Sequence, residues 1–243
     1  MRRSLIMLGG AFAMCSAGSA WACEVSDLYG LDNFPVPVVS ADASRLHFLA
    51  PASNDKPGCP AASEQCTLPT YLVAGDEVLI TDFAEGEDGL VCAHYISPAG
   101  KVTSGWLDNS ALTYRGDSMV RFDSTDAYGD WVSGLQDASI SIGPAETPDS
   151  DYVLVSGDAT RGPPSYNTGS FAGPAYMTDN NWLAGYDSDQ YRGDEPASST
   201  KTLSDGCRIR FRFAGHYLLV DDNMICGGLG VTFSGVYAKK NGP

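Results

Sequence analysis

The stretch Val231-Thr232-Phe233-Ser234-Gly235-Val236-Tyr237 alternates in character from one residue to the next. Successive side chains of a β-strand point to opposite faces. The stretch therefore has two faces, one with Val231, Phe233, Gly235 and Tyr237, the other with Thr232, Ser234 and Val236. Such a pattern is typical of an antiparallel strand with one face on a core and the other in water.

Short runs of the same kind recur along the whole chain. They are rich in Val, Ile, Tyr, Phe and Thr, and are separated by many of the 27 Gly and 14 Pro. No stretch keeps apolar residues at helical spacing over three turns, so the chain is predicted to be all-β. The clearest runs are 45–48, 71–80, 89–95 and 105–107 in the first half, and 138–142, 152–157, 207–213 and 217–220 in the second.

The N-terminus has the order of a secretory signal peptide. Met1-Arg2-Arg3 precedes an apolar stretch over 5–13, and Ala20-Trp21-Ala22 follows just before Cys23. A twin-arginine signal and a lipoprotein cysteine are the alternatives that we weigh. No other segment approaches the roughly 18 apolar residues of a membrane span, so we expect a periplasmic or secreted protein without membrane insertion.

The remaining sequence exceeds 200 residues and divides at a polar stretch over 115–130. We expect a signal peptide over 1–22, an N-terminal extension over 23–43, a first β domain over 44–115 and a second over 116–243. Ala74-Gly75-Asp76 and Ser97–Lys101 are predicted turns within the first domain.

Six of the seven cysteines follow the predicted leader, an even number that favours three disulfides in an oxidising compartment. Spacing alone does not determine the pairing. Cys59 with Cys66 would close a short Pro-rich loop and Cys207 with Cys226 a hairpin, which would leave Cys23 to pair with Cys92.

The chain carries 30 acidic against 15 basic residues, a formal net charge of −15. This charge repels phosphates, so nucleic acid is excluded as an expected partner. It favours a cationic protein or basic peptide, although solubility alone is the simpler explanation.

Over Ser44 to Leu112 the sequence resembles a bacterial SH3-like domain. The resemblance rests on F-x-x-P at Phe48, on Y-L-V-x-G-D-x-V at 71–78 and on G-W-L at 105–107, before a predicted helical turn that ends in Leu112. Domains of this family are small bent barrels that bind peptides or peptidoglycan through an aromatic groove. The resemblance implies that Tyr71, Tyr95 and Trp106 border such a groove. In the alternative, Trp106 closes the core and Tyr71 packs at a strand end.

The ending C-G-G-x-x-V-x-F-x-G-x-Y from Cys226 to Tyr237 resembles small exported bacterial β domains, some of them calycin-like. We therefore expect an N-terminal SH3-like barrel followed by a second antiparallel β-barrel or sandwich. The Pro-, Asn- and Asp-rich segment 161–200 does not have the pattern of packed structure. Its aromatic residues, Trp182 and Tyr186 among them, are candidates for binding a basic partner, or else anchors of a solvated insertion.

The run Ser204–Phe211 resembles the Ser-His-Gly-Cys-x-Arg signature of L,D-transpeptidases, with Asp205 in place of the histidine. A carboxylate beside Cys207 would raise the pKa of its thiol and oppose nucleophilicity, so the disulfide interpretation is preferred. The three histidines are isolated in the sequence, and we expect no metal and no cofactor.

The sequence thus favours a non-enzymatic envelope protein that binds peptidoglycan peptides or a cationic envelope protein. A peptidoglycan-remodelling enzyme with Cys207 as nucleophile is the first alternative. A hollow barrel that carries a small apolar ligand is the second.

Overall fold

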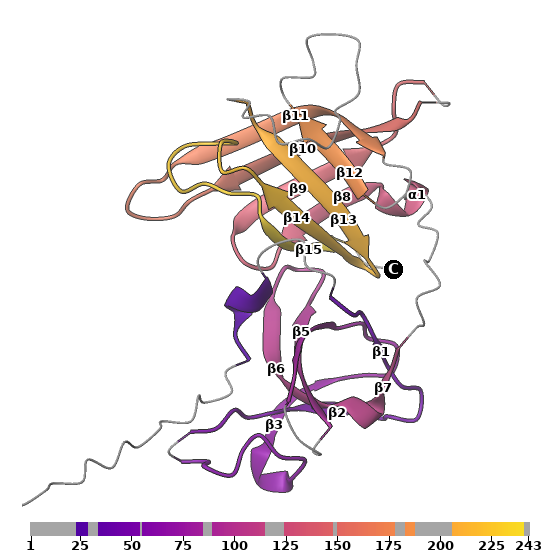
Figure 1. Ribbon diagram of the computed structural model, residues 1–243, viewed down its shortest axis with the longest axis vertical. Coiled ribbons are helices and arrows are strands. Elements are labelled where there is room, and N and C mark those ends of the chain that lie inside the picture. Colours follow the sequence, from indigo (N-terminus) through magenta and orange to yellow (C-terminus); the bar gives the residue numbers. More distant parts are fainter. Residues whose placement is uncertain are drawn as a thin grey trace, which may run out of the picture.

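The computed structural model describes residues 23–28, 34–53, 55–84, 89–114, 124–147, 150–177, 183–187 and 206–240. Two bodies of antiparallel strands lie against each other in Figure 1. The first half of the chain forms small, bent sheets, and the second half forms a closed barrel. The predicted all-β class and the second antiparallel barrel are confirmed.

The first half contains a five-stranded sheet in the order β3-β2-β6-β5-β4 and a separate β1-β7 pair. The predicted turns are present, because Gly75 and Gly100 adopt φ values of 93° and 77° that favour glycine. Its elements are η1 (Val25–Leu28), β1 (Val38–Val39), β2 (Leu46–Leu49), η2 (Glu64–Cys66), β3 (Thr67–Leu72), β4 (Leu79–Phe83), β5 (Leu90–Ile96), β6 (Val102–Asp108), η3 (Asn109–Ala111) and β7 (Leu112–Thr113).

The second half forms an eight-stranded barrel in the order β10-β11-β12-β13-β14-β15-β8-β9. Closure removes the exposed sheet edges that invite aggregation. Its elements are α1 (Ser124–Ala127), β8 (Gly129–Ser133), β9 (Asp137–Gly143), β10 (Tyr152–Thr160), β11 (Thr168–Met177), β12 (Leu183–Asp187), β13 (Arg208–Ala214), β14 (Tyr217–Asp222) and β15 (Gly235–Lys239).

Two sequence-based expectations were wrong here. The segment 161–200 supplies β11 and β12, which are integral to the barrel. The glycines of β11 hid this strand from pattern analysis. Gly169 is needed there, because a Cβ on it would lie only 2.6 Å from the carbonyl oxygen of Cys226. The last strand also begins at Gly235 and not at Val231, since 231–234 runs alongside Asp222 in a loop.

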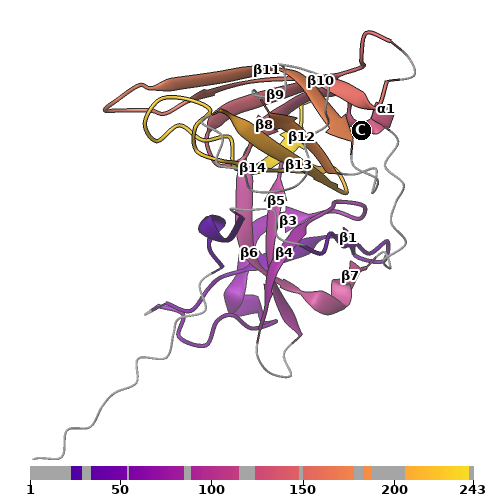
Figure 2. The same cartoon turned by 45° about the horizontal axis from the view of Figure 1, so that its top comes forward.

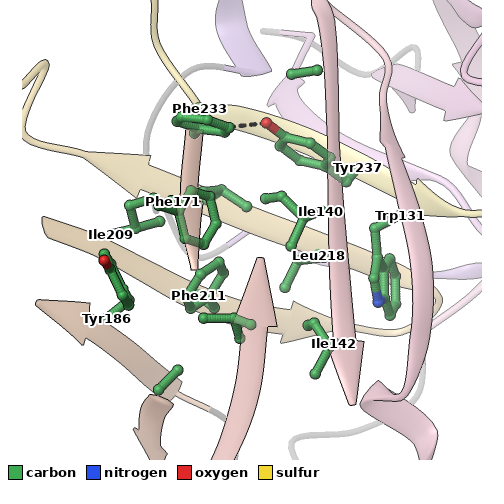
Figure 3. Packing of buried hydrophobic residues seen from close by; sticks show 14 of the residues in the cluster. Trp131, Ile140, Ile142, Phe171, Tyr186, Ile209, Phe211, Leu218, Phe233 and Tyr237 are labelled. Atoms are coloured by element: carbon green, nitrogen blue, oxygen red, sulfur yellow. Dashed lines mark hydrogen bonds between the residues drawn. The ribbon is translucent and has the colours of Figure 1, made fainter. Parts of the chain in front are cut away.

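Side chains fill the barrel interior (Figure 3). The ring of Phe171 meets that of Phe233 edge-on at 4.8 Å, and the Tyr237 hydroxyl donates to the carbonyl of Phe233. Gly157 leaves the space that Phe171 occupies, because a Cβ there would collide with the ring. This packed interior contradicts the hollow-carrier alternative.

The outer faces of β14 and β15 are covered by the first half of the chain. Figures 1 and 2 both show the β5–β6 hairpin reaching these strands. Tyr217, Leu219, Val236 and Ala238 form one buried cluster with Leu28, Leu79 and Ile96. Val236 was expected to face water with Thr232 and Ser234. It is buried because a second domain covers that face, which strand periodicity alone does not reveal.

Candidate functional site

The three expected disulfides are all present. Bonds join Cys23 to Cys92, Cys59 to Cys66 and Cys207 to Cys226. The sulfur of Cys207 is therefore covalently held and is not a thiolate nucleophile in this structure. The strand β13 begins directly after Cys207. Its side chains alternate between the two faces, so Arg210 is exposed and Phe211 is buried.

The three aromatic residues assigned to an SH3-type groove lie in different environments. Trp106 is only 1% exposed and packs with Cys92 and Leu49, so it is a core residue, as in the alternative interpretation. Tyr95 is half-buried against the core. Tyr71 is 42% exposed, with the guanidinium of Arg45 at 4.5 Å from its ring centroid and the His47 ring at 5.4 Å.

Of the two candidate binding residues in the segment 161–200, the structure describes one. Tyr186 lies inside the barrel, where its ring is 5.2 Å from that of Phe171. It is a core residue and not a surface ligand, because β12 turns its side chain inward. Trp182 lies outside the described residues.

The loop 223–234 between β14 and β15, here called the presentation loop, is organised around a buried carboxylate. Asp222 accepts hydrogen bonds from the backbone N–H of Met224 and Phe233 (3.2 and 2.6 Å) and from the hydroxyls of Thr232 and Ser234 (2.9 and 3.1 Å). A carboxylate with several donors is a strong anchor for a loop that lies outside the regular strands and pairs with β11 through an isolated bridge between Gly227 and Gly169.

The middle of the presentation loop is tied to the β10–β11 hairpin. The N–H of Gly228 donates to the carbonyl of Thr168 at 3.0 Å, and the Asn167 amide donates to the carbonyl of Leu229 at 2.7 Å. The Cys207–Cys226 disulfide adds a covalent tie to the start of β13. The loop backbone is thus fixed at three points.

This fixed backbone displays apolar side chains to solvent. Exposed fractions are 59% for Met224, 51% for Ile225 and 87% for Leu229, and Tyr166 of the tied hairpin is 66% exposed. Met224 and Tyr166 adopt φ values of 62° and 48°, and no other non-glycine residue in the described ranges has positive φ. Strained backbone of this kind is retained where the surrounding structure holds it, often at functional sites.

An open pocket of about 490 Å³ lies beside the apolar side chains. Ile225 and the Cys207–Cys226 pair form part of its lining, together with the exposed residues Asp158, Thr168 and Ser170. The pocket lining therefore combines one exposed apolar side chain, Ile225, with the carboxylate of Asp158 and two hydroxyl groups. Pattern analysis missed it because Gly227-Gly228-Leu229-Gly230 indicates only a turn.

The described residues contain no helix with the length and apolar character needed to cross a membrane. No family model, curated protein or solved structure matches this chain. The fold and the site define a disulfide-stapled protein with a packed antiparallel barrel and a rigid apolar loop at its surface.

Proposed function

We propose that this is an exported, non-catalytic protein of the bacterial envelope that binds a basic envelope protein through the presentation loop. The observation that carries the proposal is the exposure of Met224, Ile225 and Leu229 on a backbone held by the Asp222 carboxylate and a disulfide. Exposed apolar side chains that gather on one surface are typical of interaction sites.

The rigidity of the loop is a further argument that its exposed apolar side chains form a binding surface. A preformed loop loses little conformational entropy when a partner docks, so more of the contact energy remains as affinity. The strained Met224 and Tyr166 are held in place before any partner arrives.

Charge argues for a basic partner. The net charge of −15 would accelerate encounter with a cationic protein and would exclude anionic ones. Asp158 in the adjoining pocket would face basic groups around the partner's apolar patch.

The three disulfides agree with an oxidising compartment, and the N-terminal leader pattern favours the periplasm or secretion. The SH3-like resemblance of the first half motivates a second candidate, peptidoglycan binding. Exposed Tyr71 is the aromatic group that favours it.

A retention experiment tests the proposal. The immobilised protein is challenged with total periplasmic protein and with purified peptidoglycan at about 50 mM and about 500 mM salt. We expect a basic protein to be retained at low salt, released at high salt, and lost with the double variant Ile225→Ser/Leu229→Ser. The control is Phe83→Ser, which removes a 52% exposed side chain from the other half of the molecule.

Equal retention by the double variant and the wild type would overturn the role of the loop. Retention of peptidoglycan that depends on Tyr71 and not on Leu229 would instead support the wall-binding candidate.

A further inference from the structure

A polar cluster unrelated to the presentation loop lies inside the first half, around the Cys23–Cys92 disulfide. Cys92 on β5 is fully buried, whereas Cys23 is partly exposed. The sulfurs of both cysteines and the imidazole of His94 lie within 4.8 Å of one another. Because the sulfurs share a covalent bond, the group is a disulfide beside an imidazole and not a metal centre.

A β-bulge aims a hydroxyl at the buried sulfur. Ile80 pairs with Ala93 and Asp82 with Cys92, so Thr81 is the extra residue on β4. Bulges redirect side chains and recur next to active sites. Here the Thr81 hydroxyl donates a hydrogen bond of 3.2 Å to Sγ of Cys92.

His94 continues the hydrogen-bond network from Thr81 to Ser104. Its Nε2 lies 2.8 Å from the Thr81 oxygen and 3.4 Å from Sγ of Cys92, and its Nδ1 lies 2.7 Å from the Ser104 hydroxyl. When Thr81 gives its single proton to sulfur, its oxygen accepts from Nε2–H of the tautomer that carries the proton on Nε2. With a neutral imidazole of this tautomer, the Ser104 hydroxyl donates to Nδ1. The hydrogen bonds then run in one direction, from Ser104 through His94 and Thr81 to Cys92.

We propose that the Cys23–Cys92 bond is a site of thiol–disulfide exchange, with Cys92 as the leaving sulfur. An external thiolate attacks Sγ of the partly exposed residue Cys23 and forms a mixed disulfide there. The Sγ–Sγ bond breaks, and its electron pair stays on Cys92 as a thiolate. A second external thiolate then attacks the external sulfur of the mixed disulfide, and Cys23 leaves as a thiolate. The two external thiols are thereby oxidised to a disulfide, and the protein is reduced.

The Thr81 hydroxyl and the imidazole stabilise the charge that develops on Cys92. A leaving thiol with a lower pKa departs faster, and a hydrogen bond to the charged form lowers that pKa. Thr81 and His94 are therefore positioning residues that act through the leaving sulfur.

The Cys207–Cys226 bond is an internal contrast. It also joins a partly exposed cysteine to a buried one. However, Sγ of Cys226 lies 3.8 Å from two acceptor oxygens, the carbonyl of Arg208 and Oδ1 of Asn223. Acceptor oxygens disfavour a thiolate, so this bond should resist exchange. Cys59 and Cys66 are both buried, which denies an external thiol access.

Cleavage would release a structural tie. Cys23 lies two residues before the short η1 segment, and Leu28 at the end of η1 is fully buried in the cluster between the two halves of the molecule. Reduction of this one bond therefore removes the covalent tie next to η1, while the packing of Leu28 in the buried cluster remains.

Timed exposure of the oxidised protein to glutathione, followed by peptide mass mapping, tests the proposal. We expect the Cys23–Cys92 bond to open first, with the glutathione adduct on Cys23. Thr81→Val should slow this opening about tenfold, as expected for loss of one hydrogen bond to a charged group, while Thr81→Ser retains the rate. Opening of Cys207–Cys226 in the same sample is the internal control.

The order of opening and the position of the adduct are read in the unaltered protein, so they do not depend on how a variant folds. Earlier opening of Cys207–Cys226, an adduct on Cys92, or a folded Thr81→Val protein with an unchanged rate would each overturn the proposal. Circular dichroism before reduction verifies that both Thr81 variants are folded.

Discussion

The backbone N–H of His216 donates a 2.7 Å hydrogen bond to Oε2 of Glu77, 139 positions earlier in the chain. Glu77 is buried in the segment between β3 and β4, and His216 lies in the turn between β13 and β14. The Tyr217 hydroxyl donates to the carbonyl of Glu77 at 2.6 Å. Gly215 adopts φ 57°, and a Cβ there would collide with the Glu77 carboxylate. These contacts join the barrel to the first half of the molecule.

Glu77→Ala should lower the free energy of unfolding by about 1–3 kcal/mol, because the N–H of His216 loses its acceptor in a partly buried interface. Urea unfolding followed by tryptophan fluorescence measures the change. The control Glu146→Ala removes an exposed carboxylate and should change stability by less than about 0.5 kcal/mol. Equal effects of the two substitutions would contradict a structural role for Glu77.

Gly157→Ala should destabilise the barrel by about 1–3 kcal/mol, because the added methyl group meets the Phe171 ring in a filled interior. Gly143→Ala, also on a strand, adds a methyl group with nothing within 4 Å and should have little effect. Thermal melts of the two variants give the comparison. A stable Gly157→Ala protein would indicate that the interior has spare room after all.

Asp222→Asn should loosen the presentation loop, because an amide NH₂ would replace one of the carboxylate oxygens that face the loop's donors. We expect the free energy of unfolding to fall by about 1–3 kcal/mol and proteolysis within 223–234 to become faster. Asp221→Asn is the matched control. Asp221 pairs with Arg210 on the surface, and such exposed pairs contribute about 0–1 kcal/mol. Identical proteolysis of the two variants would refute the anchoring role of Asp222.

Burial raises the pKa of the Tyr217 and Tyr237 phenols well above the ordinary value near 10. The unfolded chain ionises near pH 10 while these folded-state phenols remain neutral. Their contribution to stability is therefore fully present below about pH 10 and is lost as the pH rises further, by about 1.4 kcal/mol per pH unit for each tyrosine.

Denaturant unfolding between about pH 9 and 11.5 measures this slope. Tyr237→Phe should reduce it by the share of one tyrosine, whereas Tyr166→Phe at an exposed position should leave it unchanged. A wild-type slope in Tyr237→Phe would show that the buried phenol does not cause the alkaline loss.

Much of the fold could be predicted from local pattern. Strands over 138–142, 152–157 and 207–213 were found because each alternates and lies with one face on the core and the other outside. β11 was missed because Gly169, Gly173 and Pro174 oppose strand propensity, and the reason for Gly169 is its close approach to Cys226 and Gly227 in a distant segment.

The candidate sites were less predictable. Parity predicted three disulfides and loop length favoured the Cys59–Cys66 and Cys207–Cys226 pairs, but neither determined the pairing or the environment of each sulfur. Thr81 reaches Cys92 through a bulge, and bulges leave no reliable mark in one sequence. The exposed Leu229 sits among glycines that indicate only a turn.

By itself, the sequence determined the all-β class, the turns at Gly75 and Gly100 and the even number of cysteines after the leader, since these depend on neighbours close along the chain or on counting. The pairing of the cysteines was open among alternatives until the tertiary structure placed Cys23 beside Cys92, 69 positions away. Only the tertiary structure decided which apolar residues face water. Val236 is covered because segments more than a hundred positions away in the sequence pack against it. Ile225 is exposed because Asp222 and the Cys207–Cys226 bond hold its loop in a conformation that turns the side chain to solvent.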